Sequence, residues 1–89
     1  MAELLFSPEA DDALDALERD PTSEHLAGRV HTALDRLEAD PGAAQNRRRR
    51  FHTIGLWGVP VISGSDEWLI LWEPDEHGDV IVHHIVPAP

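Results

Sequence analysis

Residues 67–86 read EWLILWEPDEHGDVIVHHIV, two runs of strand-forming residues on either side of a short polar segment. Trp68 to Trp72 is apolar at every position, which is typical of a central strand with both faces covered. Val80 to Val86 is rich in β-branched residues, and Pro74 to Asp79 is rich in turn formers. The segment therefore predicts an antiparallel hairpin inside a sheet.

Two further strands are expected immediately upstream of this hairpin. Leu56 to Ser63 and Arg48 to Ile54 follow a period of two, and Gly64-Ser65-Asp66 supplies the turn into the hairpin. Pro60 has no amide hydrogen to donate to a sheet ladder, so it predicts a bulge or an edge position. The last three strands are expected to form an antiparallel meander.

The first forty residues carry the periodicity of two amphipathic helices. Ser7-Pro8-Glu9 combines a hydroxyl N-cap, a proline at the first helical position and an acid near the helix dipole. Asp20-Pro21 ends this helix, Thr22 or Ser23 is expected to cap the next, and Asp40-Pro41-Gly42 ends that one. The apolar stripes are Ala10, Ala13, Leu14 and Leu17 in the first helix, and Leu26, Val30, Ala33, Leu34 and Leu37 in the second.

A short strand over Glu3 to Phe6 completes the element order β-α-α-β-β-β-β. This order predicts an α+β fold, in which an N-terminal strand and a helical hairpin pack on one face of a small antiparallel sheet. A chain of 89 residues has room for one hydrophobic core, so residues 1–89 are expected to form a single domain.

The composition favours an intracellular protein. The chain has no cysteine, which excludes disulfides and thiolate metal sites and fits a reducing cytoplasm. The N-terminal residues lack the basic and apolar regions of a signal peptide, and the longest apolar run is far below the roughly 20 residues of a membrane helix. We therefore expect a cytoplasmic protein without a membrane segment.

Four consecutive arginines, Arg47 to Arg50, interrupt a chain whose net charge is −10. Such a cluster either binds an anionic group of another molecule or pairs with the acidic residues of the chain's own helices. The negative charge disfavours nonspecific nucleic-acid binding, although acids beyond a Debye length of about 8 Å are largely screened. The sequence leaves both alternatives open.

Strand alternation divides the arginine cluster between the two faces of the sheet. If Phe51 faces the helices, then Arg48, Arg50 and His52 share the open face. Two guanidinium groups beside an imidazole suit a phosphate, and with RNA they can supply part of the acid–base and charge-stabilising chemistry of cleavage. Arg48, Arg50 and His52 are therefore the candidate catalytic residues.

Histidine and tryptophan supply the remaining candidates. His83 and His84 are expected to point to opposite faces of the last strand, so only one of them can join the catalytic group, and His83 is the candidate. Trp68 and Trp72 share a face that favours core packing, whereas Trp57 lies in a glycine-rich stretch that favours an exposed contact. The candidate nucleic-acid or anion contacts are Arg47, Arg48, Arg49, Arg50 and Trp57. No metal or other cofactor is expected, because the histidines lack metal-ligand spacing.

Several segments stand out when the elements are taken in order: Ser7-Pro8-Glu9-Ala10 after a short strand, the arginines that begin the sheet, and the strands around Trp68 to Trp72 and Val80-Ile81-Val82. In these segments and in its element order, the chain resembles the RelE/ParE toxins of bacterial toxin–antitoxin modules. The resemblance implies a small toxin held by a cognate antitoxin that wraps its surface. In the RelE branch the implied activity is cleavage of messenger RNA on the ribosome, and in the ParE branch it is inhibition of DNA gyrase.

Two positions depart from the RelE pattern. Asp66-Glu67-Trp68 stands where such nucleases usually carry a basic residue, and Pro87-Ala88-Pro89 stands where a tail with His, Arg or Tyr is common. Only Arg47 to Arg50 have a counterpart. Three hypotheses therefore stay open: a ribosome-dependent endoribonuclease (an mRNA interferase), a gyrase inhibitor, and a non-catalytic protein-binding module of the same fold. The sequence does not indicate an oligomeric state.

Overall fold

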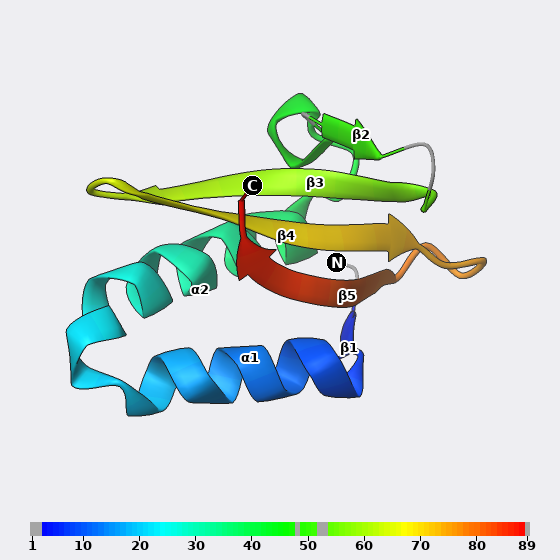
Figure 1. Ribbon diagram of the computed structural model, residues 1–89. Coiled ribbons are helices and arrows are strands. Elements are labelled where there is room, and N and C mark those ends of the chain that lie inside the picture. Colours follow the sequence, from blue (N-terminus) through cyan, green and yellow to red (C-terminus); the bar gives the residue numbers. More distant parts are fainter. Residues whose placement is uncertain (1–2, 48, 52–53, 89) are drawn as a thin grey trace.

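The computed structural model describes residues 3–47, 49–51 and 54–88 (Figure 1). No helix within these ranges is long and apolar enough to cross a membrane. The elements follow the expected order, with two short 3-10 helices added. They are β1 (Leu4–Phe6), α1 (Pro8–Arg19), η1 (Pro21–Ser23), α2 (Glu24–Ala39), η2 (Ala44–Arg47), β2 (Arg49–Phe51), β3 (Leu56–Ser63), β4 (Asp66–Pro74) and β5 (Val80–Pro87).

All five strands lie in one sheet, in the order β1-β5-β4-β3-β2. β3, β4 and β5 pair with antiparallel neighbours, which confirms the expected meander. β1 runs parallel to β5, with Leu4 opposite Val80 and Phe6 opposite Val82, so the expectation of a purely antiparallel sheet was wrong. Two α-helices and three strands separate β1 from β5 along the chain. A connection of that length permits parallel pairing, which a tight turn does not.

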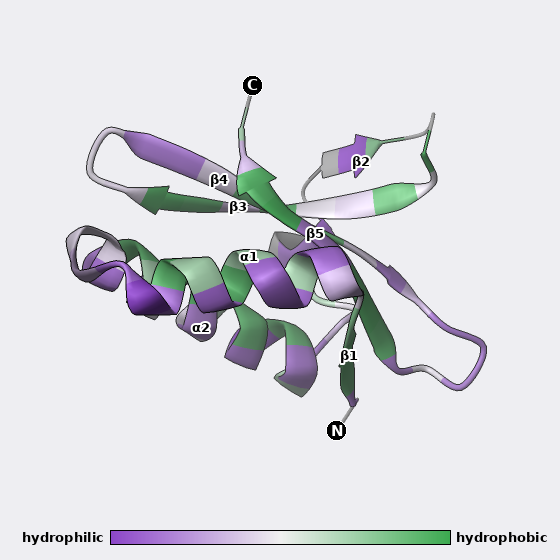
Figure 2. Ribbon diagram, turned by 60° about the horizontal axis from the view of Figure 1, so that its bottom comes forward, coloured by the Kyte–Doolittle hydropathy of each residue, from purple (hydrophilic) through white to green (hydrophobic). Residues whose placement is uncertain are grey.

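Both helices cover the same face of the sheet, as expected, and each alternates between hydrophilic and hydrophobic residues along its length (Figures 1 and 2). α1 begins at Pro8 because the Ser7 hydroxyl oxygen accepts the backbone N–H of Ala10 at 3.1 Å. The apolar stripes of the two helices pack against β3, β4 and β5 in one core cluster. The core residues with no exposed surface are Ala10, Val30, Leu37, Ile70, Trp72, Val80 and Val82.

Asp20 organises the junction between the helices. Its carboxylate accepts hydrogen bonds from the Thr22 backbone N–H at 2.9 Å, the Thr22 hydroxyl at 2.7 Å and the Ser23 hydroxyl at 3.1 Å. These bonds, that from the Thr22 side chain above all, hold the pKa of Asp20 below its ordinary value. Ser23 is the N-cap residue of α2, as expected, but its hydroxyl donates to Asp20 and makes no capping hydrogen bond to the helix.

A second apolar cluster lies on the other face of the sheet. Leu56, Leu69 and Leu71 are buried there, and Phe51 packs against them. The expectation that Phe51 faces the helices was therefore wrong. The reason is the register of β2, which places Phe51 opposite Leu56 and Arg50 opposite Trp57, whose ring packs against the helix-side core.

The strand expected over residues 48–54 is shorter than predicted. η2 extends through Arg47, and after Phe51 the chain turns, since the backbone N–H groups of Ile54 and Gly55 both donate to the Phe51 carbonyl, at 3.2 and 2.8 Å. Gly55 has a φ of 71°, a left-handed conformation that favours glycine. Only the start of β3 is therefore paired with β2.

Pro60 lies beyond this pairing, which confirms an edge position. β2 pairs with Leu56 to Gly58, and past Gly58 no described strand adjoins the outer edge of β3. Pro60 is paired with Leu69 of β4 on its inner side. Because no described strand adjoins its outer side, the missing amide hydrogen of Pro60 costs the sheet no hydrogen bond there.

Candidate functional site

Two of the four clustered arginines stack on the same tryptophan. The Arg47 Cζ lies 5.2 Å from the centre of the Trp57 ring and 5.5 Å from that of Trp72. The Arg50 Cζ lies 4.8 Å from the Trp57 ring centre. A guanidinium at these distances is attracted by the negative face of an indole, so both side chains are held in position by cation–π contacts.

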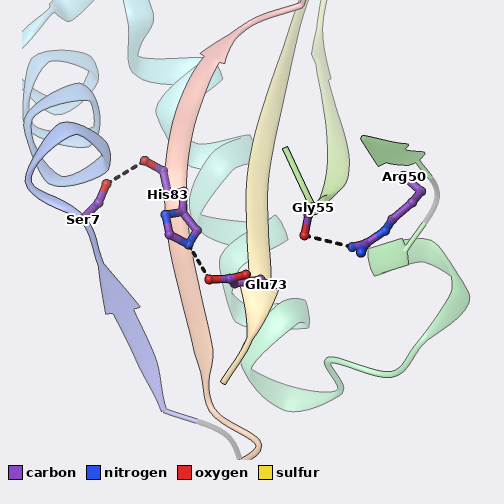
Figure 3. A network of polar contacts seen from close by, with 5 residues as sticks. All are labelled: Ser7, Arg50, Gly55, Glu73 and His83. Atoms are coloured by element: carbon purple, nitrogen blue, oxygen red, sulfur yellow. Dashed lines mark hydrogen bonds and ion pairs between the residues drawn. The ribbon is translucent and has the colours of Figure 1, made fainter. Parts of the chain in front are cut away.

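Each guanidinium is also tied to a backbone carbonyl. Arg47 Nε donates to the Pro41 oxygen at 3.0 Å, and Arg50 Nη1 donates to the Gly55 oxygen at 3.1 Å, which Figure 3 shows. A guanidinium has five N–H groups, so one such bond leaves most of its donors available. Arg47 is half-buried and Arg50 is exposed, which leaves those donors accessible to a ligand.

Asn46 holds η2 and its arginine in place. Its side-chain amide donates to the carbonyl oxygens of Asp40 at 2.6 Å and Arg36 at 3.3 Å, at the end of α2. Its own backbone carbonyl accepts the indole N–H of Trp72 at 2.8 Å. Asn46 is the one buried polar residue among those described, and a lone asparagine in a polar linker gave no sequence signal of this role.

The arginines do not pair with the chain's own acids at the two positions where their side chains are described. Within residues 3–47, 49–51 and 54–88, no carboxylate lies in ion-pair contact with Arg47 or Arg50. By contrast, the exposed Arg19 lies 3.7 Å from Asp15 on α1. For Arg47 and Arg50 the structure thus removes one of the two alternatives that the sequence left open, pairing with the acidic helices.

The remaining members of the predicted catalytic group are placed differently. Arg48 and His52 lie outside the described residues, as does the side chain of Arg49. Arg50 is opposite Trp57 and stacks on its ring, so it lies on the helix side of the sheet edge and not on the open face. This follows from the reversed orientation of Phe51.

His83 makes a polar contact with Glu73 on the open face. Its Nε2 lies 2.9 Å from Glu73 Oε1, and its backbone carbonyl accepts the Ser7 hydroxyl at 2.6 Å (Figure 3). Glu73 follows the core residue Trp72 in β4, so it points away from the helices. A histidine oriented by a carboxylate is suited to proton transfer.

The expectation that His83 and His84 point to opposite faces was wrong. The register of β4 and β5 shifts so that His84 pairs with Leu71 and Val82 pairs with Trp72, which leaves His83 as an extra residue in β5. Such a bulge interrupts side-chain alternation, and the two rings lie 6.4 Å apart. His84 Nδ1 lies 3.3 Å from Glu9 Oε2 of α1, so each histidine has a glutamate partner.

The structure does not bring His83 and Arg50 together. They lie on β5 and β2, which are separated by β4 and β3. Neighbouring strands are about 4.8 Å apart, so the two backbones are separated by about 14 Å of sheet. In Figure 3 His83 and the Arg50–Gly55 pair accordingly lie on opposite sides of β4, the strand that carries Glu73.

The three tryptophans divide as the sequence suggested for the core. Trp72 is fully buried and Trp68 is half-buried against the same helix-side cluster, which confirms their packing role. Trp57 is also half-buried, and both described guanidinium groups lie over its ring. Among the described residues, no group of three His, Asp or Glu side chains is arranged to hold a metal ion.

Comparison with known proteins adds no identification. Neither models of protein families, nor curated proteins, nor solved structures give a significant match to this chain. The functional argument therefore rests on the residues and geometry described above.

Proposed function

We propose that this chain is the toxin-like component of a bacterial toxin–antitoxin module, with a RelE/ParE-like fold, and that it acts in the cytoplasm together with a cognate antitoxin. One observation carries the proposal: Arg47 and Arg50 are held against Trp57 without a carboxylate partner among the described residues, in a chain of net charge −10. Two guanidinium groups that are held in position without a carboxylate partner favour contact with an anionic group of another molecule.

The element order supports the same proposal. The short strand β1 and the meander lie in one sheet, and the two helices of the hairpin cover one face of it. The arginines lie where the chain enters that sheet after the second helix. This is the arrangement on which the resemblance to RelE/ParE toxins rests. Ribosomal mRNA and DNA gyrase are the two targets that the resemblance offers.

Target assays with the purified protein test this proposal. We expect the protein either to cleave messenger RNA on translating ribosomes or to inhibit supercoiling by gyrase, and Arg47→Gln/Arg50→Gln to lose that effect. Arg19→Gln is the matched control, because it removes an exposed arginine of α1 that lies outside the cluster. Absence of both effects from the wild type, or full activity in the double variant, contradicts the proposal.

The surroundings of His83 favour a second candidate, a non-catalytic protein-binding module of the same fold. His83 lies beside Glu73, and the neighbouring His84 lies beside Glu9. Two carboxylates near the open-face histidines repel a scissile phosphate, and the Arg50 that could offset them is about 14 Å of sheet away. A stable complex with a protein partner, together with neither target effect, is the result that this candidate predicts.

A further inference from the structure

Two arginines of α2 lie along the free edge of β3. Arg29 Nε donates to the Ile62 carbonyl at 3.1 Å. Arg36, two turns further along the same helix, lines a small polar groove with Arg29, Pro60 and Ile62. Both arginines are exposed, so helix α2 presents two cations beside the unpaired part of this strand.

Arg47 and Arg50 continue this line of charge to the other end of β3. They stack on Trp57, and the five steps from Trp57 to Ile62 span about 17 Å of strand. Four of the chain's seven basic residues thus lie beside β3 and the short β2 that pairs with its start, and we call Arg29, Arg36, Arg47 and Arg50 the arginine row. Within the part of the chain that the structure describes, none of the four has an ion-pair partner.

Exposed aliphatic side chains mark both ends of the arginine row. Ile62, whose carbonyl binds Arg29, is 55% exposed, and Ile54, which precedes the Gly55 that binds Arg50, is 54% exposed. They are the two most exposed large hydrophobic residues described. An edge with cations along its length and apolar groups at its ends is complementary to a segment with the opposite charge and an apolar side chain at each end.

We propose that the arginine row docks an extended acidic segment of a partner protein, whose apolar side chains contact Ile54 and Ile62. The inference rests on the proposed function for the anion contact at Arg47 and Arg50, and it adds Arg29, Arg36 and the chemistry of the partner. Recognition runs through side chains and not through an added strand. Pro60 offers no amide hydrogen, and the Ile62 carbonyl already accepts a bond from Arg29.

An acidic protein segment fits this edge better than single-stranded RNA does. Proteins that hold single strands stack bases on exposed aromatic faces. The aromatic residue in the row is Trp57, which is half-buried and has two guanidinium groups over its ring. The exposed groups at the ends, Ile54 and Ile62, are aliphatic and provide no stacking surface for a base.

The test is a binding titration with a fluorescent glutamate-rich peptide that carries a leucine at each end. A length of about eight residues extends to roughly 26 Å, enough to cover the row. We expect Arg29→Gln/Arg36→Gln and Arg47→Gln/Arg50→Gln each to weaken binding about tenfold, the loss expected for two exposed ion pairs. Arg19→Gln is the control and changes the dissociation constant by less than about twofold.

Three results overturn the inference. They are a wild type that binds the peptide no better than its lysine-rich counterpart, an unchanged affinity in Arg29→Gln/Arg36→Gln, and an oligouridylate that binds the same four arginines more tightly than the peptide. NMR of the wild type gives a second readout that needs no variant: the peptide should shift the amide signals of Ile54 and Ile62. A protein that acts on ribosomes or gyrase yet fails to bind the peptide contradicts this inference alone.

Discussion

The backbone carbonyl of Asn46 accepts a hydrogen bond from the indole N–H of Trp72 at 2.8 Å. This bond joins the most buried aromatic residue of the sheet to the 3-10 helix that carries Arg47. Arg47 itself also lies over the Trp72 ring. These two contacts make the position of Arg47 in the candidate site depend on the hydrophobic core around Trp72.

Asn46→Ala should therefore destabilise the fold. The substitution removes the two hydrogen bonds that the Asn46 amide donates to the carbonyls of Arg36 and Asp40, each of which keeps one backbone N–H donor, and each lost bond costs about 0.5–1.5 kcal/mol. The free energy of unfolding, measured with urea, checks this value. Ile62→Ala, at an exposed position, should change it by less than about 0.5 kcal/mol. Equal effects of the two substitutions are incompatible with the role given to Asn46.

Trp57→Leu should weaken binding of the glutamate-rich peptide about threefold to fivefold, because both guanidinium groups lose the ring that holds them, a contact worth about 0.5–1 kcal/mol. Trp57→Phe keeps an aromatic face and should retain most of the affinity. Fluorescence anisotropy at a temperature where circular dichroism shows both variants folded makes the comparison. If leucine binds as well as phenylalanine at this position, the ring does not organise the arginines.

Asp20→Ala should lower the melting temperature at neutral pH and have little effect in strong acid. Hydrogen bonds lower the pKa of Asp20 in the folded state, so its contribution is present above the unfolded pKa and is lost as the pH falls through the folded pKa. Thermal unfolding across the acid range measures the difference, with the exposed Asp35→Ala as control. A destabilisation that grows as the pH falls has the wrong sign for this account.

His83→Ala should leave peptide binding unchanged within about twofold, because His83 is on β5 and the arginine row lies along β3 and beyond it. The same substitution removes the imidazole that Glu73 orients, so it should abolish any RNA cleavage that uses the open face. Running both assays on one preparation separates the two surfaces. A tenfold loss of peptide affinity in His83→Ala shows that the binding surface extends across the sheet.

The sequence was sufficient for most of the fold. Ser7-Pro8 marked the start of α1, and the apolar run from Trp68 to Trp72 identified a central strand, because local capping and periodicity determine these features. The parallel pairing of β1 with β5 was not predictable in the same way. It depends on where two segments more than seventy residues apart meet, and no local pattern in Leu4 to Phe6 specifies it.

The candidate site was only partly predictable. The arginine cluster is visible in the sequence, but its orientation was inferred from the expectation that Phe51 faces the helices. Phe51 instead packs in the apolar cluster on the open face, which turns Arg50 to the helix side. Simple alternation also failed at His83, where a bulge adds a residue to β5. The place of Arg29 beside Ile62 depends on how α2 packs against β3, which periodicity alone does not specify.

Growth of bacterial cells in which the chain is expressed alone tests the central claim, that Arg47 and Arg50 contact an anionic group of a target. We expect the wild type and Arg19→Gln to arrest growth, and Arg47→Gln/Arg50→Gln to permit growth at the rate of cells without the protein. Equal expression of the three proteins, checked by immunoblot, is required for the comparison. No arrest by the wild type, or full arrest by the double variant, contradicts the account.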